Sequence, residues 1–204
     1  MSSTNRGGDR HVSDYYVTPH KEIIRFLERF ACYEPECLTG EIYDPCAGGD
    51  INAMQGMAYP SALIEFGINP EQVFTLDIRK DSPADDTGDY LFTPLDSKPT
   101  LIITNPPFAI AREIIEKAYG EVAESGFVVM LLRLNFLGSK GRRDLWRRIM
   151  PKYIFVHPDR MSFTSDGKTD SIEYAHFCWQ KGRETFEDSE GQTIRKTQSI
   201  LEIL

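Results

Sequence analysis

Short apolar segments, each closed by a polar residue or a Gly/Pro turn, set the strongest limit on how this chain folds. Strand-like composition is found at residues 41–46, 73–78, 101–107, 127–133, 153–158 and 174–180. Apolar side chains at helical spacing lie between several of these segments, at residues 60–66, 109–124 and 139–149. Because strands and helices alternate, we expect an α/β fold with a mostly parallel sheet.

The two ends of this pattern differ from its middle. No helical pattern separates the last two segments, so we expect them to pair as antiparallel strands at the sheet edge. Residues 90–92 are a candidate for one further, very short strand. A helix is expected to start near Pro19, with Thr18 as its N-cap. We expect a flexible tail at 1–13, one domain at 14–182, and a tail or docking helix at 183–204.

Composition narrows the class of protein. The 204 residues include 23 basic and 31 acidic side chains, a net charge of −8, which disfavours a uniformly basic nucleic-acid coat protein. No apolar run reaches the roughly 20 residues of a membrane span, and the N-terminus lacks the apolar stretch of a secretory signal. We therefore expect a cytoplasmic protein without a membrane partner, and its oligomeric state stays open.

Cysteines and histidines show no metal-ligand spacing, so we predict no metal site. No CxxC pair occurs, and we expect reduced thiols, with Cys32, Cys37 and Cys178 buried as small hydrophobic residues. His20, His157 and His176 are expected to be packing or surface residues. Trp146 and Trp179 are expected in the core.

Polar residues follow several of the predicted strands. Asp44-Pro45-Cys46-Ala47-Gly48-Gly49-Asp50 ends the first, Asp77 ends the second, Asp89 precedes the short segment near residue 90, and Asn105-Pro106-Pro107-Phe108 ends the LIIT strand. Ligands of doubly wound sheets bind at the carboxyl ends of the strands. These groups are therefore candidates for one shared cleft.

The Asn-Pro-Pro-Phe corner is the most informative of these motifs. Two successive prolines remove two backbone donors and fix two φ angles, which makes a stiff loop with accepting carbonyls. The Asn105 side-chain oxygen and the Pro106 carbonyl can each accept one hydrogen of an exocyclic amine, while Phe108 stacks on its ring. The alternative is a strand-terminating turn in which Asn105 caps the helix at 109–124. We favour a function because acidic residues end the neighbouring strands.

The order of these motifs resembles that of the S-adenosylmethionine-dependent amino-methyltransferases. DYYVTP at 14–19, DPCAGG at 44–49, Asp77, Asp89-Tyr90 and NPPF at 105–108 are most similar to small, phage- or prophage-type DNA adenine-N6 methyltransferases. Residues 160–179 resemble the arginine–phenylalanine segment and final strands of that family. The resemblance covers roughly residues 13–180 and implies a Rossmann-like class I methyltransferase fold in a bacterial or phage-infected host cell.

The resemblance also implies a role for individual residues. Residues 44–48 would wrap the methionine part of S-adenosyl-L-methionine, Asp77 would bind its ribose, Ile78 would pack on its adenine, and Asp89, next to Tyr90, would accept from the adenine amino group. Asn105, Pro106, Pro107 and Phe108 would form the catalytic corner. The implied cofactor-binding residues are Tyr16, Thr18, Pro19, Asp44, Pro45, Cys46, Ala47, Gly48, Asp77, Ile78, Asp89 and Tyr90.

One position departs from the family pattern. The motif often reads D-P-x-x-G-x-G, and Asp50 stands where the last glycine is expected. Its side chain would either crowd the cofactor carboxylate, or Gly49 would take over the tight turn and leave Asp50 to cap the next segment. We favour the second interpretation because Gly48-Gly49 keeps the loop flexible.

A basic segment offers a surface for nucleic acid. Residues 133–152 hold seven basic side chains and one acidic one in a chain of net charge −8. Phosphate contacts supply most of the nonspecific affinity for DNA, although a solvated amphipathic helix would carry the same charges. The candidate nucleic-acid-binding residues of this segment are Arg133, Lys140, Arg142, Arg143 and Arg147. The family resemblance adds Arg160 and Phe163, which it implies near the flipped base or its phosphate.

These observations lead us to expect methyl transfer to adenine N6 in DNA. A flipped-out base would have to enter a pocket at the strand ends. RNA base amines and protein glutamine amides are alternative substrates, because NPPF-type loops serve those as well. A non-catalytic module that keeps the fold to bind nucleic acid or a partner is the alternative from another class.

Overall fold

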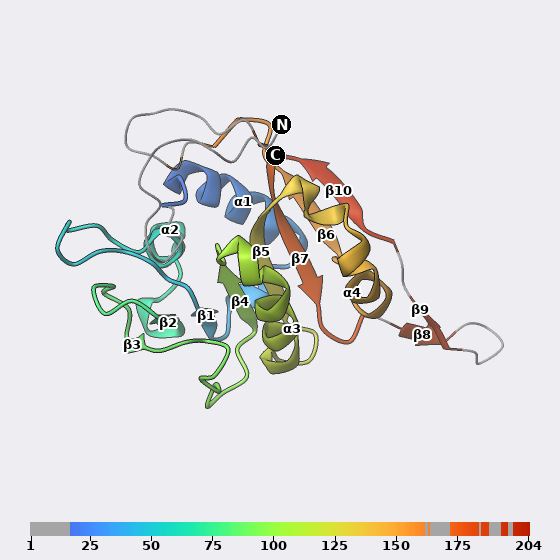
Figure 1. Cartoon of the computed structure of the whole chain (residues 1–204), viewed down its shortest axis with the longest axis horizontal. Coiled ribbons are helices and arrows are strands. Elements are labelled where there is room, and N and C mark those ends of the chain that lie inside the picture. Colours follow the sequence, from blue (N-terminus) through green and yellow to red (C-terminus); the bar gives the residue numbers. More distant parts are fainter. Residues whose placement is uncertain (1–16, 162, 164–171, 184, 188–192, 196–197) are drawn as a thin grey trace.

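The computed structural model describes residues 17–161, 163, 172–183, 185–187, 193–195 and 198–204. Helices and short 3-10 turns alternate with strands along most of this length (Figure 1). The strands are β1 Ile42–Asp44, β2 Val73–Asp77, β3 Asp86–Thr87, β4 Leu101–Thr104, β5 Phe127–Arg133, β6 Tyr153–Val156, β7 Tyr174–Gln180, β8 Thr185–Glu187, β9 Thr193–Arg195 and β10 Ile200–Ile203. The helices are α1 His20–Tyr33, α2 Ala58–Phe66, α3 Ala111–Glu121 and α4 Arg143–Arg148, and the 3-10 turns are η1 Pro35–Leu38, η2 Pro70–Gln72, η3 Phe108–Ile110, η4 Leu134–Leu137 and η5 Lys140–Arg142.

Eight of the strands form one sheet in the order β10-β6-β7-β5-β4-β1-β2-β3. β7 runs antiparallel to its neighbours β5 and β6, and the other neighbouring pairs of this sheet are parallel. The predicted α/β fold with a mostly parallel sheet and an antiparallel pair toward one edge is therefore confirmed. The strand order reverses between β1 and β4, which is where ligands of such sheets bind.

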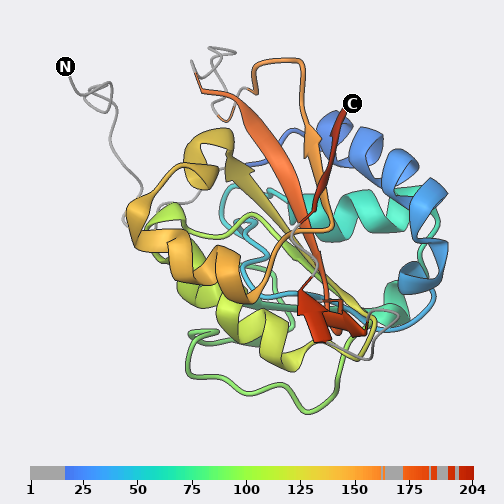
Figure 2. The same cartoon turned by 90° about the vertical axis from the view of Figure 1, so that its right-hand side faces the viewer.

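Helices cover both faces of this sheet. Figure 2 shows α1 and α2 on one side and α3 and α4 on the other. Alternate residues of β5 face the two layers: Val129 and Leu131 join the cluster that contains α1 and α2, whereas Val128 and Met130 join the cluster with α3 and α4. Burial on both faces explains why these strands are continuous apolar runs rather than alternating ones.

Helix α1 forms because its apolar residues recur at helical spacing. Ile23, Phe26, Leu27 and Phe30 are fully buried, and Phe30 packs edge-on against the ring of Phe127 in β5, with 5.4 Å between the ring centroids. These side chains hold α1 against the middle of the sheet. The helix thereby brings its N-terminal end, and the residues just before it, to the edge where β1 and β4 end.

Three local expectations were wrong. The N-cap of α1 is Pro19, and no described side chain caps it, so Thr18 does not have the predicted capping role. Residues 90–92 form a turn after the short strand β3 at Asp86–Thr87. At the C-terminus, Ile200–Ile203 is not a docking helix: it is strand β10, which pairs in parallel with β6 and extends that edge of the sheet.

Other expectations lie partly outside the described residues. The tail at 1–13 is not described, so its flexibility stays a prediction.

Cys37 and Cys178 are buried as predicted, but Cys32 is exposed on α1. Trp179 is fully buried, and Trp146 is half-buried and stacks on it with 6.5 Å between the ring centroids. Within the described part of the chain, none of the helices has the length and apolar character that a membrane crossing requires.

Candidate functional site

A cavity of about 400 Å³ lies at the carboxyl ends of β1, β2 and β4. Its walls come from the loops that follow these strands, from the start of α2 and from the residues before α1. All four residues of the Asn-Pro-Pro-Phe corner line it, as do most of the predicted cofactor residues. The predicted residues in its lining are Thr18, Pro45, Cys46, Ala47, Gly48, Asp77, Ile78, Asp89, Tyr90, Asn105, Pro106, Pro107 and Phe108.

Two of the described cofactor candidates do not line this cavity: Asp44 is fully buried at the end of β1, and Pro19 is the N-cap of α1. Tyr16 lies outside the described residues, so its place stays a prediction. Burial raises the pKa of Asp44 to about 7, although its Oδ1 accepts a hydrogen bond from the Cys46 amide at 3.1 Å. Asp44 therefore hydrogen-bonds to the backbone of the loop that follows β1 and is not part of the cavity lining.

The loop after β1 depends on two glycines in the left-handed region, Gly48 with φ of 69° and Gly49 with φ of 77°. A Cβ on Gly49 would lie 2.7 Å from Cδ of Pro83, so no other residue fits there. The Gly48 amide donates to Asp77 Oδ2 at 2.8 Å. These two glycines bring bare backbone to the cavity wall, as the interpretation of Gly48-Gly49 predicted.

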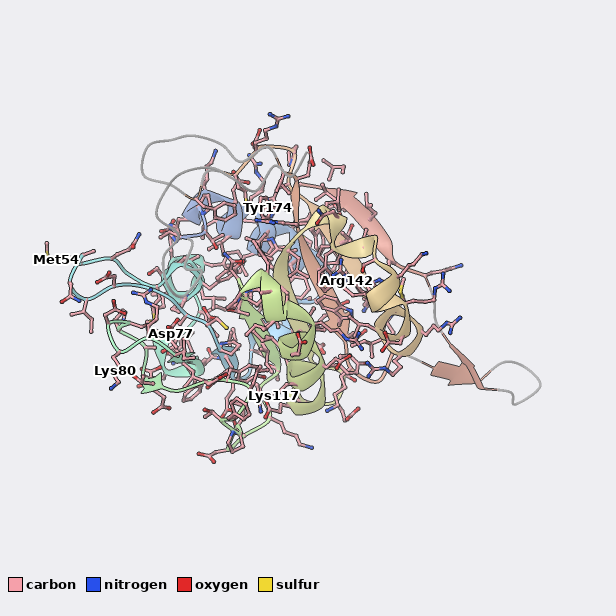
Figure 3. All side chains as sticks on the ribbon, in the orientation of Figure 1. Met54, Asp77, Lys80, Lys117, Arg142 and Tyr174 are labelled. Atoms are coloured by element: carbon pink, nitrogen blue, oxygen red, sulfur yellow. The ribbon has the colours of Figure 1, made fainter. Side chains whose placement is uncertain are left out.

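Asp50 turns away from the cavity. Its Oδ1 accepts from the amides of Asn52 and Ala53 at 2.8 and 3.0 Å, and its backbone pairs with Gln55 in a short bridge. The loop it closes carries Met54, 93% exposed, at a tip that projects into solvent (Figure 3). Asp50 therefore caps the next segment, and its carboxylate is not part of the cavity lining.

Asp77 joins two of the loops. It is 6% exposed, and its two carboxylate oxygens accept from the backbone amides of Gly48 and Arg79, each at 2.8 Å. Figure 3 labels this residue among the loops that follow β1 and β2. A carboxylate accepts more than two hydrogen bonds, so this arrangement leaves capacity for a ligand hydroxyl while it fixes the side chain.

The remaining wall on this side is mostly apolar. Ile78 is 60% exposed beside the cavity. Asp89 Oδ1 accepts from the Leu91 amide at 2.9 Å, which closes the turn that follows β3. Tyr90 is buried, and its hydroxyl donates to Glu121 on α3 at 2.8 Å, so only its ring is available to the cavity.

The Asn-Pro-Pro-Phe corner follows β4 and does not cap a helix. Helix α3 has Ile110 as its N-cap, without a capping side chain among the described residues, and the turn η3, which begins at the last corner residue Phe108, lies between Asn105 and α3. Instead, Asn105 Nδ2 donates to Thr18 Oγ1 at 3.1 Å. This bond turns the other end of the amide, its oxygen, away from Thr18. The helix-cap alternative for Asn105 is therefore wrong.

Phe108 belongs to an aromatic cluster that the sequence pattern did not reveal. The Arg133 guanidinium lies 4.8 Å from the centroid of its ring, and the Tyr174 ring lies 6.0 Å away. Phe163 packs edge-on against Tyr174 with 4.8 Å between the ring centroids. Figure 3 labels Tyr174 at the start of β7. The cluster thus joins Phe108, Phe163 and Arg133 next to the corner.

The basic segment does not form one surface. Lys140, Arg142 and Arg143 precede or begin α4, near the ends of β4 and β5 (Arg142 is labelled in Figure 3). Lys152 precedes β6, which is parallel to β5, so it lies at the opposite edge of the sheet. Arg147 lies in the last turn of α4, away from that first edge. Arg160 is exposed beyond β6.

Arg133 and Arg142 each lie over an aromatic ring and are only partly exposed to solvent. Arg142 donates through Nε to the Phe136 carbonyl at 2.7 Å, and its guanidinium lies 4.2 Å from the Phe136 ring. Burial lowers the pKa of Arg142. Lys140 and Arg143 are exposed in the segment that follows β5 and remain the best-placed candidates for phosphate contacts.

Tyr59 is a cavity residue that the sequence did not indicate. It lies on α2, is 2% exposed, and contributes to the lining. Its sequence context is an ordinary helical segment, so no local signal marks it. Among the described residues, no group of three His, Cys, Asp or Glu side chains is placed to hold a metal ion.

Comparison with known proteins finds similar structures but no similar sequences. No protein-family model matches the chain, and no curated protein sequence matches it. A protein from Listeria monocytogenes provisionally described as a class I S-adenosylmethionine-dependent methyltransferase superposes with a TM-score of 0.60 and 13% identity, over 97% of this chain and 68% of that one. A Pyrococcus horikoshii protein provisionally described as an RNA methyltransferase gives 0.58 and 14%, over 83% and 87%.

The M protein of the type I restriction enzyme EcoKI is a third similar structure. It superposes with a TM-score of 0.55 and 14% identity, over 92% of this chain and 48% of that protein. The chain thus has the same Rossmann-like fold as these methyltransferase structures. At these identities the likeness concerns the fold.

Proposed function

We propose that this protein transfers a methyl group from S-adenosylmethionine to an exocyclic amine, and that the amine is N6 of adenine in DNA. The observation that carries the proposal is the shared cavity: the Asn-Pro-Pro-Phe corner lines the same space as Gly48 and Asp77. The motif resemblance and the fold of the neighbouring structures support the same assignment.

The cavity residues fit this cofactor. Its volume of about 400 Å³ lies within the range of small-molecule sites. Gly48 and Gly49 expose backbone to the methionine part, Asp77 is fixed where a ribose hydroxyl can donate to it, and Ile78 offers an apolar surface for the adenine. Bound there, S-adenosylmethionine would supply an electrophilic methyl group.

The corner would hold the acceptor amine. The Asn105 amide oxygen and the Pro106 carbonyl each accept one amine hydrogen, which aims the nitrogen lone pair at the cofactor side of the cavity. Phe108 stacks on the base. Such a corner acts by orientation and by placing acceptors where positive charge develops on the nitrogen. The residues need neither a covalent nucleophile nor a strong base for this task.

DNA is the substrate that the surroundings of the corner favour. A base within a duplex has to flip out to reach the cavity, at a cost of about a few kcal/mol. Stacking on Phe108 offsets roughly 1–3 kcal/mol of this cost. Lys140 and Arg143 would contact phosphates at the cavity edge, and Arg160 and Phe163 would lie near the flipped nucleotide.

Two alternatives stand behind this proposal. An RNA base amine fits the same corner, and one structural neighbour is described provisionally as an RNA methyltransferase. A non-catalytic module is the second alternative, motivated by the aspartate at position 50 and by the lack of an obvious separate target-recognition domain in this sequence. Because that carboxylate bonds to Asn52 and Ala53 outside the cavity, this reason for doubting cofactor binding no longer applies.

Transfer of a tritiated methyl group separates these possibilities. The purified protein is incubated with labelled S-adenosylmethionine and, in parallel, with duplex DNA, structured RNA and a mixed protein extract, and the products are digested to nucleosides or amino acids. We expect the label in N6-methyl-2′-deoxyadenosine from DNA. Label only in RNA or in glutamine would move the proposal to that substrate, and binding of cofactor without transfer to any of them would contradict it.

A further inference from the structure

A chain of four buried polar side chains leads from the cavity wall to the first turn of helix α1. The Tyr59 hydroxyl lies 2.9 Å from His176 Nε2, His176 Nδ1 lies 2.8 Å from His157 Nε2, and His157 Nδ1 lies 3.2 Å from Glu22 Oε2. Each of the four residues is at most 2% exposed. We call Tyr59, His176, His157 and Glu22 the histidine relay.

The relay links elements that are distant in sequence. Tyr59 lies on α2, His176 in β7, His157 just after β6, and Glu22 in the first turn of α1. Only Tyr59 lines the cavity. At the other end Glu22 forms ion pairs with Arg25 and Lys21, at 3.3 Å each, and Arg25 in turn pairs with Asp159 at the surface.

Packing alone does not require these residue types. The relay lies in the apolar layer between α1 and the sheet, where His176 stacks on Phe26 with 4.0 Å between the ring centroids. Apolar residues of the same volume would fill this space without desolvating four polar groups. A fully bonded buried network does, however, fix the orientation of every member.

Hydrogen bonding in the relay has one consistent direction. The Glu22 carboxylate only accepts, so His157 Nδ1 has to carry a proton. Burial lowers the pKa of His157 to about 4 and the pKa of His176 well below its usual value, so both rings are neutral at pH 7. His157 Nε2 therefore accepts from His176 Nδ1, and His176 Nε2 accepts from the Tyr59 hydroxyl.

This direction continues to the catalytic corner. The Tyr59 hydroxyl donates to His176, so its oxygen is left as an acceptor on the cavity side. Thr18 lines the same cavity. Burial raises the pKa of Tyr59, and the Thr18 hydroxyl lowers it, which is the effect of a donor directed at the Tyr59 oxygen. Thr18 has a single hydroxyl proton. Once this proton points at Tyr59, Thr18 Oγ1 faces Asn105 as an acceptor, and it receives the Asn105 Nδ2 hydrogen at 3.1 Å.

We propose that the histidine relay acts, through Thr18, as a positioning network that holds the Asn105 amide with its nitrogen inward and its oxygen toward the acceptor amine. Reversal of the relay would make Thr18 a donor to Asn105 and would turn the amide nitrogen toward the substrate, where it repels an amine hydrogen. The inference rests on the proposed function for its consequence in catalysis. The direction of the relay is a property of the folded protein itself.

The first test reads the direction without any substrate. Histidine labelled at its ring nitrogens is incorporated into the whole protein, and the nitrogen chemical shifts of His157 and His176 are recorded at pH 7, with His157→Gln and His176→Gln used to assign the signals. We expect both rings to be neutral with the proton on Nδ1. A proton on Nε2 of either ring would overturn the proposal.

The second test reads the consequence. Tyr59→Phe removes one oxygen from the cavity end of the relay, and Glu22→Met removes the acceptor from its far end. We expect both variants to lose about tenfold or more in kcat, since each loses the hydrogen bonds that fix the amide. Glu22 does not line the cavity, so Glu22→Met should keep its cofactor affinity. In Glu22→Met we also expect the Nε2-protonated form of His157 to become populated.

A control separates positioning from simple loss of stability. Phe30→Leu shortens a fully buried side chain on the same helix, and the ring contacts of Phe30 are with Phe26, Phe127 and Phe155, which lie outside the relay. It should lower the melting temperature at least as much as Glu22→Met and keep kcat. Equal loss of kcat in Phe30→Leu and Glu22→Met would overturn the positioning role.

Failure of the two proposals gives different results. If the protein transfers no methyl group to any substrate, the proposed function fails, while the tautomers measured in the first test still confirm or refute the direction of the relay. If the protein is active and Tyr59→Phe retains the full kcat, the proposed function stands and the relay has no part in it.

Discussion

Two regions at the same edge of the sheet are built in different ways. In the loops after β1 and β2, carboxylates accept hydrogen bonds from nearby backbone amides: Asp77 from Gly48 and Arg79, and Asp50 from Asn52. In the segment after β5, Arg142 lies over the ring of Phe136 and donates to the Phe136 carbonyl, while Lys140 and Arg143 are exposed. The first region is a preformed cavity, and the second is an exposed surface.

This difference shows that a small molecule and a charged polymer make different demands on the residues that bind them. A cavity for a small molecule needs its polar groups in place before binding, because each misplaced group costs affinity. A surface for a charged polymer needs only cations that reach phosphates, and long side chains adapt to them. Substitutions should therefore act strongly and locally in the cavity loops, and weakly and through charge in the segment after β5.

The largest effect is expected at the catalytic corner. Asn105→Ala removes one of the two acceptors for the amine and should lower turnover by about a thousandfold, while cofactor affinity measured by calorimetry stays unchanged. Phe108→Ala should lower turnover by roughly ten- to a hundredfold through lost stacking. Asn135→Ala, an exposed asparagine in the turn after β5, is the control. Unchanged turnover in both corner variants would remove the corner from the mechanism.

The second effect is expected in the pH dependence of the free energy of unfolding, through the buried His157. Burial lowers the pKa of His157 from its ordinary 6.5 to about 4. Between these values the unfolded chain binds a proton that the folded protein does not. The free energy of unfolding therefore rises with pH in this range, and the contribution of His157 to it is lost as the pH falls from 6.5 through 4. The shift corresponds to roughly 3 kcal/mol.

Denaturant titrations between pH 4 and 7 measure this dependence. His157→Gln should flatten the rise relative to the parent protein. Asp44 contributes with the opposite sign, because its raised pKa makes the folded protein hold a proton that the unfolded chain releases, and it does so equally in both proteins. His20→Gln removes a histidine with a 41% exposed side chain and is the matched control. Parallel curves for the parent and His157→Gln would contradict the prediction.

The elements that the sequence predicted are those governed by local rules. The strands were visible because a sheet covered on both faces needs continuous apolar segments such as 127–133. Gly48-Gly49 and the prolines at 106–107 were visible because only these residue types adopt or enforce such backbone shapes. Their placement around one cavity follows from the carboxyl ends of parallel strands meeting at one edge.

Features that depend on distant partners were not visible. Thr18 was expected to cap α1, but it bonds to Asn105, which lies 87 positions away in sequence. Arg142 was expected on a DNA-facing patch, but Phe136 binds it. Ile200–Ile203 was expected as a helix or a tail, but the exposed edge of β6 offers it backbone hydrogen bonds as a strand. In each case tertiary contacts override the local pattern.

A third effect tests the backbone of the cavity loops. Gly49 has φ of 77°, and a Cβ there would lie 2.7 Å from Pro83, so Gly49→Ala should destabilise the protein by about 2 kcal/mol and weaken cofactor binding. Gly120→Ala is the matched control: Gly120 lies in α3 with nothing near its added Cβ, so this change should stabilise by about 0.5–1 kcal/mol. Equal unfolding free energies for both variants would mean that the loop is not strained by a side chain.

The smallest effect is expected in the segment after β5, and it is the one that depends on salt. Arg143→Glu reverses an exposed charge near the catalytic corner and should reduce the slope of log affinity for DNA against log salt by about 1. Lys98→Glu reverses an exposed charge just before β4, at the opposite edge of the sheet, and should leave that slope unchanged. Cofactor affinity should be the same in both variants, because neither residue lines the cavity. If Lys98→Glu flattened the slope as much as Arg143→Glu, DNA would be attracted by overall charge, and the edge at the cavity would have no special part in binding it.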